Sequence, residues 1–451
     1  MNPNTVGEPT EEDTSMDTSI TRSEFLQVLH RVVDALGTAV WDAVVEGETI
    51  ADADVWLRET GGQFLRQVLG AAVTARAARR GAAGRCGCGG AMTFRQHRPF
   101  RLHTVLPGRD VDVRLVYEQC GTCRRGQWPV REELAVDAEG FTRGLQELSL
   151  LAGVMEPYER ASVDLLRRFA AVAVSAEKIH TLVRDDGARA HTYVGTSPDA
   201  AARAPAAGPV YVELDGGMIL VDQRWQEVKL GCVFREEDRT ETGKRGALTA
   251  RQVVAVRGTP DDLGAVLWPT IARAGGADRL AVVLGDGAPW IWRLAEVVCP
   301  HRVEILDWYH VDEHISAAAR VLYGEGTPRA DAWRQQQLDR LWTDGVDQVL
   351  EGLRFLGAHQ RSATKRDMVT ALERYLTTNR DRVRYQTFRE AGYHIGSGAV
   401  ESAVHHVVQH RMKRPGMRWR GPGADAMLAL RSVYRSLDAW DRFWAARPRA
   451  A

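Results

Sequence analysis

Three acidic residues follow or join segments that a mixed sheet could bring together. Asp215 ends the apolar run PVYVEL, and Asp286 follows the apolar run RLAVVLG. Glu401 lies in the first turn of a predicted helix, at the edge of an apolar stripe formed by Val400, Ala403, Val404, Val407 and Val408. Three carboxylates in a small space need cations to remain ionised, and two magnesium or manganese ions are the usual solution for phosphodiester chemistry. The alternative for Glu401 is a charge that only complements the helix dipole.

The stretch Arg279–His310 supplies the predicted position of Asp286. It reads as a buried strand (Leu280–Leu284), a Gly-Asp-Gly turn, a helix carrying Trp290 and Trp292, and a second strand (Val303–Leu306). Asp286 would therefore stand at the carboxyl end of a central strand, where open α/β sheets place their chemistry.

The segments on either side of this stretch complete a predicted catalytic domain over residues 209–451. Three earlier runs (209–221, 226–234 and 251–258) indicate an antiparallel meander, with Gly216 and Gly217 turning the chain after Asp215 and a charged loop before the third strand. Three strands followed by strand, helix and strand is the order expected of an RNase H-like sheet. Residues from 311 to about 390 show only helical periodicity and indicate a helical insertion. The predicted fold class is thus α/β.

Four of the six cysteines form two close pairs, Cys86 with Cys88 and Cys120 with Cys123. Such pairs, flanked by glycine, predict one structural zinc ion that clamps a β-ribbon over residues 85–135. The alternating residues Val111, Asp112, Val113, Arg114 and Leu115 fit a strand of that ribbon. The alternative is four buried cysteines without a metal.

Two segments have the character of DNA-binding elements. After Glu401 there is no acid before Asp425, and the interval contains Arg411, Lys413, Arg414, Arg418 and Arg420 around Trp419. This pattern predicts phosphate contacts with an aromatic side chain able to stack on a base. Residues 136–196 contain a predicted helix-turn-helix with Ser175 as the N-cap of a second helix ending near Gly187, in which Glu177, Lys178 and Thr181 would face DNA. Any helical hairpin would give the same pattern.

Composition limits the remaining possibilities. A chain of 451 residues with 44% hydrophobic residues can form two or three domains. It contains no apolar run long enough to span a membrane, and its polar, acidic start is unlike a signal peptide, so we expect a cytoplasmic, nucleoid-associated protein. Besides the segments above, we expect a disordered tail (1–20), an N-terminal helical region (21–84) and an Ala/Pro-rich linker (197–208).

Several motifs together resemble the ISKra-type insertion-sequence transposases, prokaryotic relatives of Mutator-like elements. The motifs are VELDGGMI with WQEVKLGCVF, LGDGAPWIW, ILDWYHVDEH and IGSGAVESAVHHVVQHRMKRPGMRW, and they extend in consistent order over roughly residues 85–435. The resemblance implies a DDE transposase whose triad is Asp215, Asp286 and Glu401. Asp307 and His310 resemble the C/D-x-x-H signature of the wider superfamily, and would order the site or contact DNA unless they form only a strand-end turn. The Cys86-x-Cys88 pair departs from the Cys-Pro-x-Cys of such proteins.

The resulting expectation is a DNA transposase that acts as a homo-oligomer on double-stranded DNA. It would bind the terminal inverted repeats of its element, nick DNA and join 3′-hydroxyl ends to a target. Two alternatives remain open, namely a transposase-derived DNA-binding protein without catalysis and an RNase H-like nuclease without strand transfer.

Overall fold

The computed structural model describes residues 21–46, 53–79, 84–108, 110–196, 208–242, 245–276, 279–437 and 439–447. By the clustering of its contacts, the chain divides into two compact units, His180–Ala446 and Met1–Ile179 with Arg447–Ala451. We call them the sheet unit and the N-terminal unit. Their boundary falls inside a continuous helix rather than at the predicted linker. That linker, apart from Gly208, and the predicted disordered tail lie outside the described residues.

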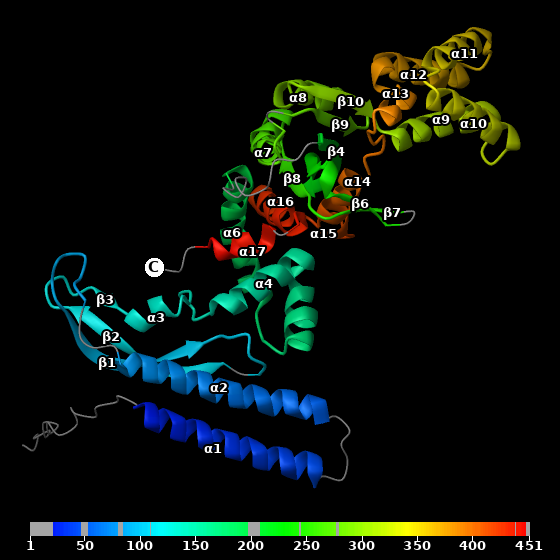
Figure 1. The fold of residues 1–451 in the computed structure, drawn as a ribbon. Coiled ribbons are helices and arrows are strands. Elements are labelled where there is room, and N and C mark those ends of the chain that lie inside the picture. Colours follow the sequence, from blue (N-terminus) through cyan, green and yellow to red (C-terminus); the bar gives the residue numbers. More distant parts are fainter. Residues whose placement is uncertain are drawn as a thin grey trace, which may run out of the picture. The chain divides into compact units, whose positions relative to one another are not determined.

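The N-terminal unit combines helices with a small antiparallel sheet (Figure 1). Its strands pair in the order β1-β2-β3. Leu115 and its neighbours on β2 pack against Val73 and Ala77 of helix α2 to form the core of the ribbon. The elements are α1 (Arg22–Val40), η1 (Trp41–Val45), α2 (Ala53–Arg79), β1 (Met92–Leu102), β2 (Val111–Cys120), β3 (Gly126–Gln127), α3 (Pro129–Glu133), α4 (Arg143–Met155), α5 (Tyr158–Arg160), η2 (Ala161–Phe169) and the start of α6 (Ala176–Thr196).

The predicted helix-turn-helix corresponds to α5 and η2, an irregular turn and α6. The Ser175 hydroxyl accepts a hydrogen bond from the Lys178 amide at 3.1 Å, as an N-cap should. The prediction that the second helix ends near Gly187 is wrong, because α6 continues to Thr196. Gly187 lies inside α6, where a Cβ would lie 2.3 Å from the Cβ of Ala426, so this glycine serves close packing rather than the end of a helix.

The sheet unit is built on a mixed five-stranded sheet with the order β10-β9-β4-β5-β8. Strands β4 (Val210–Val221), β5 (Arg224–Arg235) and β8 (Gln252–Arg257) form the predicted antiparallel meander. Strands β9 (Ala281–Gly285) and β10 (Arg302–Leu306) run parallel to β4 and to each other. Strand β9 is entirely buried, as its continuous apolar run predicts.

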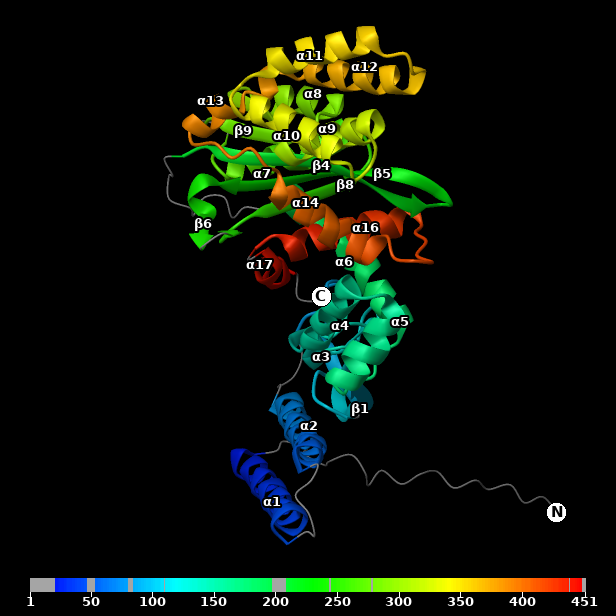
Figure 2. The ribbon, with the colours of Figure 1, turned by 90° about the vertical axis from the view of Figure 1, so that its right-hand side faces the viewer.

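Helices cover the sheet and form the insertion seen apart from it in Figure 1. Figure 2 shows α14 and α16 crossing one face of the sheet, and the contacts of α14 with β4 and β5 agree with that view. The helices are α7 (Pro260–Arg273), α8 (Pro289–Val298), the insertion α9 (Trp308–Tyr323), α10 (Pro328–Trp342), α11 (Val346–His359), α12 (Ala363–Thr378), η5 (Arg380–Arg382) and α13 (Tyr385–Glu390), then α14 (Gly398–Val404), η6 (His405–Gln409), α15 (His410–Met412), α16 (Gly421–Arg435) and α17 (Ala439–Ala445).

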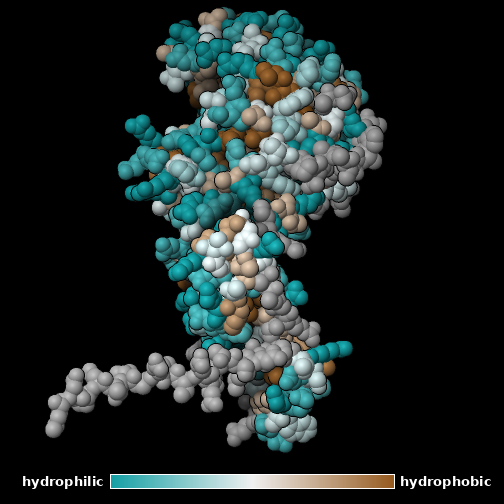
Figure 3. All heavy atoms as spheres, turned by 90° about the vertical axis from the view of Figure 1, so that its left-hand side faces the viewer, coloured by the Kyte–Doolittle hydropathy of each residue, from teal (hydrophilic) through white to brown (hydrophobic). Residues whose placement is uncertain are grey.

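The surface of the sheet unit is mixed in character. Trp268 of α7 and Val297 of α8 are both exposed and line the same shallow surface pocket. Hydrophobic atoms, brown in Figure 3, also reach the surface of this unit. In the part of the chain that the structure describes, no helix combines the length and apolar character needed to cross a membrane.

Three local predictions for the sheet unit need correction. Gly216 and Gly217 do not turn the chain, because β4 continues through both to Val221 and reverses at Asp222 and Gln223, whose φ values are 47° and 62°. Within β4, Gly217 lies beside the side chains of Val404 and Val408, which a Cβ at this position would contact at 3.6 and 3.5 Å. The predicted charged loop contains η4 (Glu236–Asp238) and a hairpin of β6 (Arg239–Thr242) and β7 (Arg245–Leu248), and helix α7 was not predicted at all.

Candidate functional site

Asp215 and Asp286 lie just past the same end of the pairing between β4 and β9. The last parallel pair between β4 and β9 joins Glu213 to Leu284. Asp215 lies two residues beyond that pair on β4, and Asp286 lies two residues beyond it on β9. Although β4 itself continues to Val221, both carboxylates therefore lie at the carboxyl end of the paired parallel segment, where α/β sheets place their functional residues.

Both aspartates are half-buried, and each accepts a hydrogen bond from a nearby backbone amide. The Gly216 amide donates to Asp215 Oδ1 at 2.6 Å, and the Ala288 amide donates to Asp286 Oδ1 at 2.8 Å. Burial raises the pKa of Asp215, and the negative charge of Asp286 raises it further. Two like charges therefore lie close together in a partly desolvated space. A bound cation would relieve the repulsion between them.

Glu401 approaches this region from helix α14. Its neighbours Val400, Ala403 and Val404 are buried, as the apolar stripe predicts, while Glu401 itself remains exposed. Burial of part of the side chain raises the pKa of Glu401, and the charges of Asp307 and Asp215 add to the effect. Glu401 therefore shares an electrostatic neighbourhood with Asp215, although it comes from a different element.

Asp307 is fully buried and uses both carboxylate oxygens in hydrogen bonds. Oδ1 accepts from the amide of His310 at 2.8 Å and lies 3.1 Å from its Nδ1, while Oδ2 accepts from the amide of Ser397 at 2.6 Å and its hydroxyl at 2.8 Å. Although burial alone would raise the pKa of Asp307, these bonds lower it. Asp307 caps α9 and at the same time holds the segment that leads into α14. It is therefore a positioning residue for both His310 and Glu401.

His310 stands at the centre of the acidic residues. Its hydrogen bond with Asp307 raises the pKa of the imidazole to about 9, and the charges of Asp286 and Asp215 contribute in the same direction. One ligand atom each from Asp307, His310 and Glu401 lie within 4.8 Å of one another, a spacing that could hold a metal ion. The structure thus brings ligand atoms of His310, Asp307 and Glu401 close together. Asp215 and Asp286 are near enough for their negative charges to raise the pKa of His310.

Two further residues of the site were not predicted. Glu213 is buried on β4, and its Oε2 accepts from the amide of Val400 at 2.8 Å; burial raises the pKa of this carboxyl to about 8. A glutamate inside an apolar strand, two residues before Asp215 and so on the same face, was the available signal. Tyr375 of α12 donates from its hydroxyl to the carbonyl of Asp286 at 2.9 Å, and no local pattern marks it.

The donor set at this site suits a hard divalent cation. Carboxylate oxygens are the ligands that magnesium prefers, and raised carboxyl pKa values are the expected result of placing such groups together without an ion. Glu401 and Asp215 both show this rise, but among the described residues the acidic-site group with ligand atoms within 4.8 Å of one another is Asp307, His310 and Glu401 rather than the predicted triad.

The four predicted zinc ligands lie together in the N-terminal unit. Ligand atoms of Cys86, Cys88, Cys120 and Cys123 all lie within 4.8 Å of one another, with Sγ–Sγ distances of 3.5 Å for Cys86–Cys123 and for Cys88–Cys120. A tetrahedral zinc with Zn–S bonds of about 2.3 Å would separate its ligands by about 3.8 Å. The Cys123 amide, donating to the sulfur of Cys120, lowers the pKa of that thiol to about 6. The cluster could therefore hold zinc despite its Cys-x-Cys pair, and four protein ligands leave no open position for catalysis.

Burial removes two residues from the predicted phosphate patch. Arg411 is 1% exposed and Trp419 is 8% exposed, with the guanidinium of Arg411 5.2 Å from the centre of the Trp419 ring. The Trp419 indole donates to the carbonyl of Met412 at 3.0 Å, so it is packed into the unit and has no free face for a base. The remaining members keep exposed or half-buried side chains, namely Lys413, Arg414, Arg418 and Arg420.

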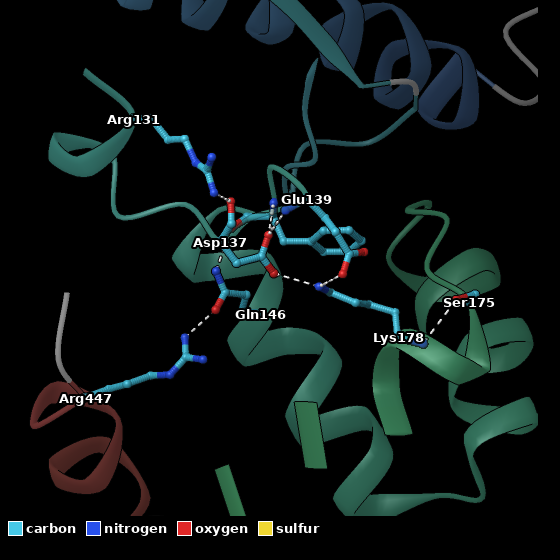
Figure 4. Close-up of polar contacts among 8 residues, drawn as sticks. Arg131, Asp137, Glu139, Gln146, Ser175, Lys178 and Arg447 are labelled. Atoms are coloured by element: carbon cyan, nitrogen blue, oxygen red, sulfur yellow. Dashed lines mark hydrogen bonds and ion pairs between the residues drawn. The ribbon is translucent and has the colours of Figure 1, made fainter. Parts of the chain in front are cut away.

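Lys178 does not face outward as predicted. Its ammonium group lies 2.7 Å from Asp137 and 2.9 Å from Glu139, and its side chain is 10% exposed (Figure 4). Burial alone would lower the pKa of Lys178, but these two carboxylates raise it. Lys178 therefore holds α6 against the loop before α4, because that loop carries Asp137 and Glu139, whose carboxylates neutralise its ammonium group.

The comparisons with known proteins identify a family and no named relative. No curated protein matches the sequence. The model of the family described as "Uncharacterised protein family (UPF0236)" matches residues 92–442, which include the cysteines Cys120 and Cys123 and the whole acidic site. Since this match covers most of the chain, the protein belongs to the UPF0236 family.

Proposed function

We propose that this protein is a DNA transposase with an RNase H-like catalytic domain. The observation that carries the proposal is that Asp215 and Asp286 each lie two residues past the last β4–β9 pair, where each affects the same group of charges as Glu401. The strand order β10-β9-β4-β5-β8 supports it, because three antiparallel strands followed by two parallel ones agree with the fold that the sequence resemblance implies.

Asp215, Asp286 and Glu401 would hold two magnesium or manganese ions. When bound, these ions would supply activation of the attacking oxygen and charge stabilisation for the leaving oxygen of a phosphodiester. Asp307 would keep His310 and the start of α14 in place through its four hydrogen bonds. His310, oriented by Asp307, would donate to a phosphate oxygen, and Tyr375 would hold the turn at Asp286.

The DNA substrate would be held by several parts of the chain. The exposed Lys413, Arg418 and Arg420 are suited to phosphate contacts, since none of them is buried by the fold. The zinc ribbon and the helices from α4 to α6 would recognise element ends, with Lys178 contributing to the fold rather than to contact with DNA. The protein would act as a homo-oligomer that pairs two ends.

The test is Glu401→Gln, with Glu351→Gln as the matched control. Glu351 is an exposed residue of α11 in the same unit, so its change repeats the loss of charge away from the site. DNA carrying the sequences that flank the coding region should be cleaved when magnesium is present but not when magnesium and manganese are left out. Glu401→Gln should lower the cleavage rate by on the order of 100-fold or more, because the site must hold two divalent cations, while binding of DNA persists. Glu351→Gln should cleave normally.

Three outcomes would contradict the proposal. Near-normal cleavage by Glu401→Gln would remove this residue from the site. DNA binding by the wild-type protein without any cleavage would favour a non-catalytic DNA-binding protein. Cleavage without joining of 3′ ends to a second DNA would favour a nuclease.

A further inference from the structure

We propose that a cavity of the N-terminal unit binds one nucleotide unit of nucleic acid, with the phosphate among arginines and the base against Trp56. The cavity has a volume of about 720 Å³ and lies between α2, the loop at Pro107–Gly108 and the end of η2. Its lining includes Trp56, Arg58, Arg66, Arg167 and Arg168. This volume is in the usual range for small-ligand sites. The choice of nucleic acid as the source of the nucleotide rests on the proposed function.

Two hydrogen bonds connect the three elements that enclose the cavity. The Gly108 amide donates to the carbonyl of Ala171 at 3.0 Å, which joins the loop to the segment after η2. Arg58 Nη2 donates to the carbonyl of Phe169 at 2.5 Å, which joins α2 to the end of η2. The cavity is therefore held by contacts between α2, the loop and η2, not by a single mobile segment.

Two glycines make room for Arg66 at the wall of the cavity. A Cβ at Gly62 would lie 2.7 Å from the carbonyl oxygen of Pro107, so only glycine lets α2 approach the loop this closely. A Cβ at Gly108 would lie 2.3 Å from Arg66 Nη1, and Gly108 also has a φ of +100°, which favours glycine. Gly62 thus permits the close approach of α2 to the loop, which places the Arg66 guanidinium beside Gly108.

The excess of positive charge in the lining of the cavity favours binding of an anion. Arg66 Nη1 is buried without a hydrogen-bond partner. Arg168 forms an ion pair with Asp164 at 3.3 Å. Among the described residues, no other arginine of the lining has a carboxylate in ion-pair range. Four arginines face a single lining acid, Glu59. Guanidinium groups in this number suit phosphate oxygens, which they can bind in pairs of hydrogen bonds.

Trp56 makes a nucleotide a better occupant than inorganic phosphate. Its ring is half-buried and forms part of the same lining as the arginines. Stacking of a base on an aromatic ring contributes about 1–3 kcal/mol and tolerates any base, so this site would hold nucleic acid without reading its sequence. Thr60 and Gln63 add polar groups to the lining.

The experiment measures binding of the full-length protein to a labelled single-stranded oligonucleotide and to its duplex without added magnesium or manganese, which keeps cleavage out of the result and leaves the zinc ribbon intact. Arg167→Gln removes an exposed cavity charge, and Arg66→Gln removes the enclosed one. Arg76→Gln is the matched control, since Arg76 also lies on α2 but pairs with Glu133 and does not line the cavity. Each cavity variant should weaken binding about tenfold and reduce the slope of log K against log salt by roughly one unit per lost contact. Arg76→Gln should bind as wild type.

The probes separate the two sources of the nucleotide. Competition by a nucleoside monophosphate would support a free nucleotide as ligand, and binding of oligonucleotides alone would support a strand. Trp56→Leu should abolish the fluorescence quenching that a stacked base produces. Wild-type affinity and salt slope in Arg167→Gln and Arg66→Gln would overturn the inference, as would competition by a phosphopeptide but not by a nucleotide. Neither result would affect the proposed function, which depends on cleavage by the Glu401→Gln variant.

Discussion

The substitution Asp307→Asn tests whether one buried carboxylate holds the site together. Asp307 is 0% exposed and accepts from His310 through one oxygen and from Ser397 through the other. Asparagine offers one acceptor oxygen, which can serve either His310 or Ser397. Its NH2 group would face the donors of the other residue and could accept no hydrogen bond from them. The Ser397 hydroxyl or the imidazole can reorient, but one backbone N–H must lose its acceptor.

The expected magnitude follows from that loss. A hydrogen bond to a charged group contributes about 1.5–3 kcal/mol, and a buried donor left unsatisfied adds its desolvation cost. We therefore expect local opening at His310 or Ser397 to become easier by about 3 kcal/mol, which corresponds to a fall of about 100-fold in amide protection.

The assay is native-state hydrogen exchange of the peptides that contain His310 and Ser397. Asp347→Asn is the control, because Asp347 pairs with Arg380 at 2.7 Å while their side chains are 60% and 56% exposed. Such a surface pair is worth less than about 1 kcal/mol, so protection near the site should not change. Unchanged protection of both amides in Asp307→Asn would refute the assignment of Asp307 as the residue that positions α9 and α14.

Two further predictions concern the N-terminal unit. Purified protein should contain one zinc ion per chain, and Cys120→Ser should remove it. The loss of zinc should also expose the amides of β1 and β2 to hydrogen exchange, because a structural zinc supplies folding free energy to a small ribbon. An unchanged zinc content in Cys120→Ser would show that the four thiols are not the zinc ligands. Lys178→Met should lower the stability of the unit by about 2 kcal/mol in urea unfolding, since it leaves Asp137 and Glu139 without their shared cation. Arg76→Met, which breaks an exposed pair with Glu133, should cost less than about 1 kcal/mol, and an equal effect of the two changes would contradict the role given to Lys178.

Much of the local structure followed from the sequence because it depends on short-range patterns. The apolar run before Asp286 formed the buried strand β9, and the stripe from Val400 to Val408 faces the sheet. The two cysteine pairs came together at the ends of adjoining strands, since their spacing on a ribbon brings such pairs face to face. The glycines after Asp215 were misread as a turn, because glycine within a strand can serve a neighbouring helix as well as a chain reversal.

The sequence by itself determined which residues could carry charge and in which periodic segments they lie. Only the tertiary structure decided which of those charges reach solvent and which meet each other. Arg411 is as basic in the sequence as Arg418, yet Trp419 and its surroundings bury the first and leave the second exposed. Asp307 finds Ser397, and Glu213 finds Val400, across intervals of 90 and 187 residues. The physical reason is that burial and hydrogen-bond partners come from long-range packing, which local periodicity does not specify.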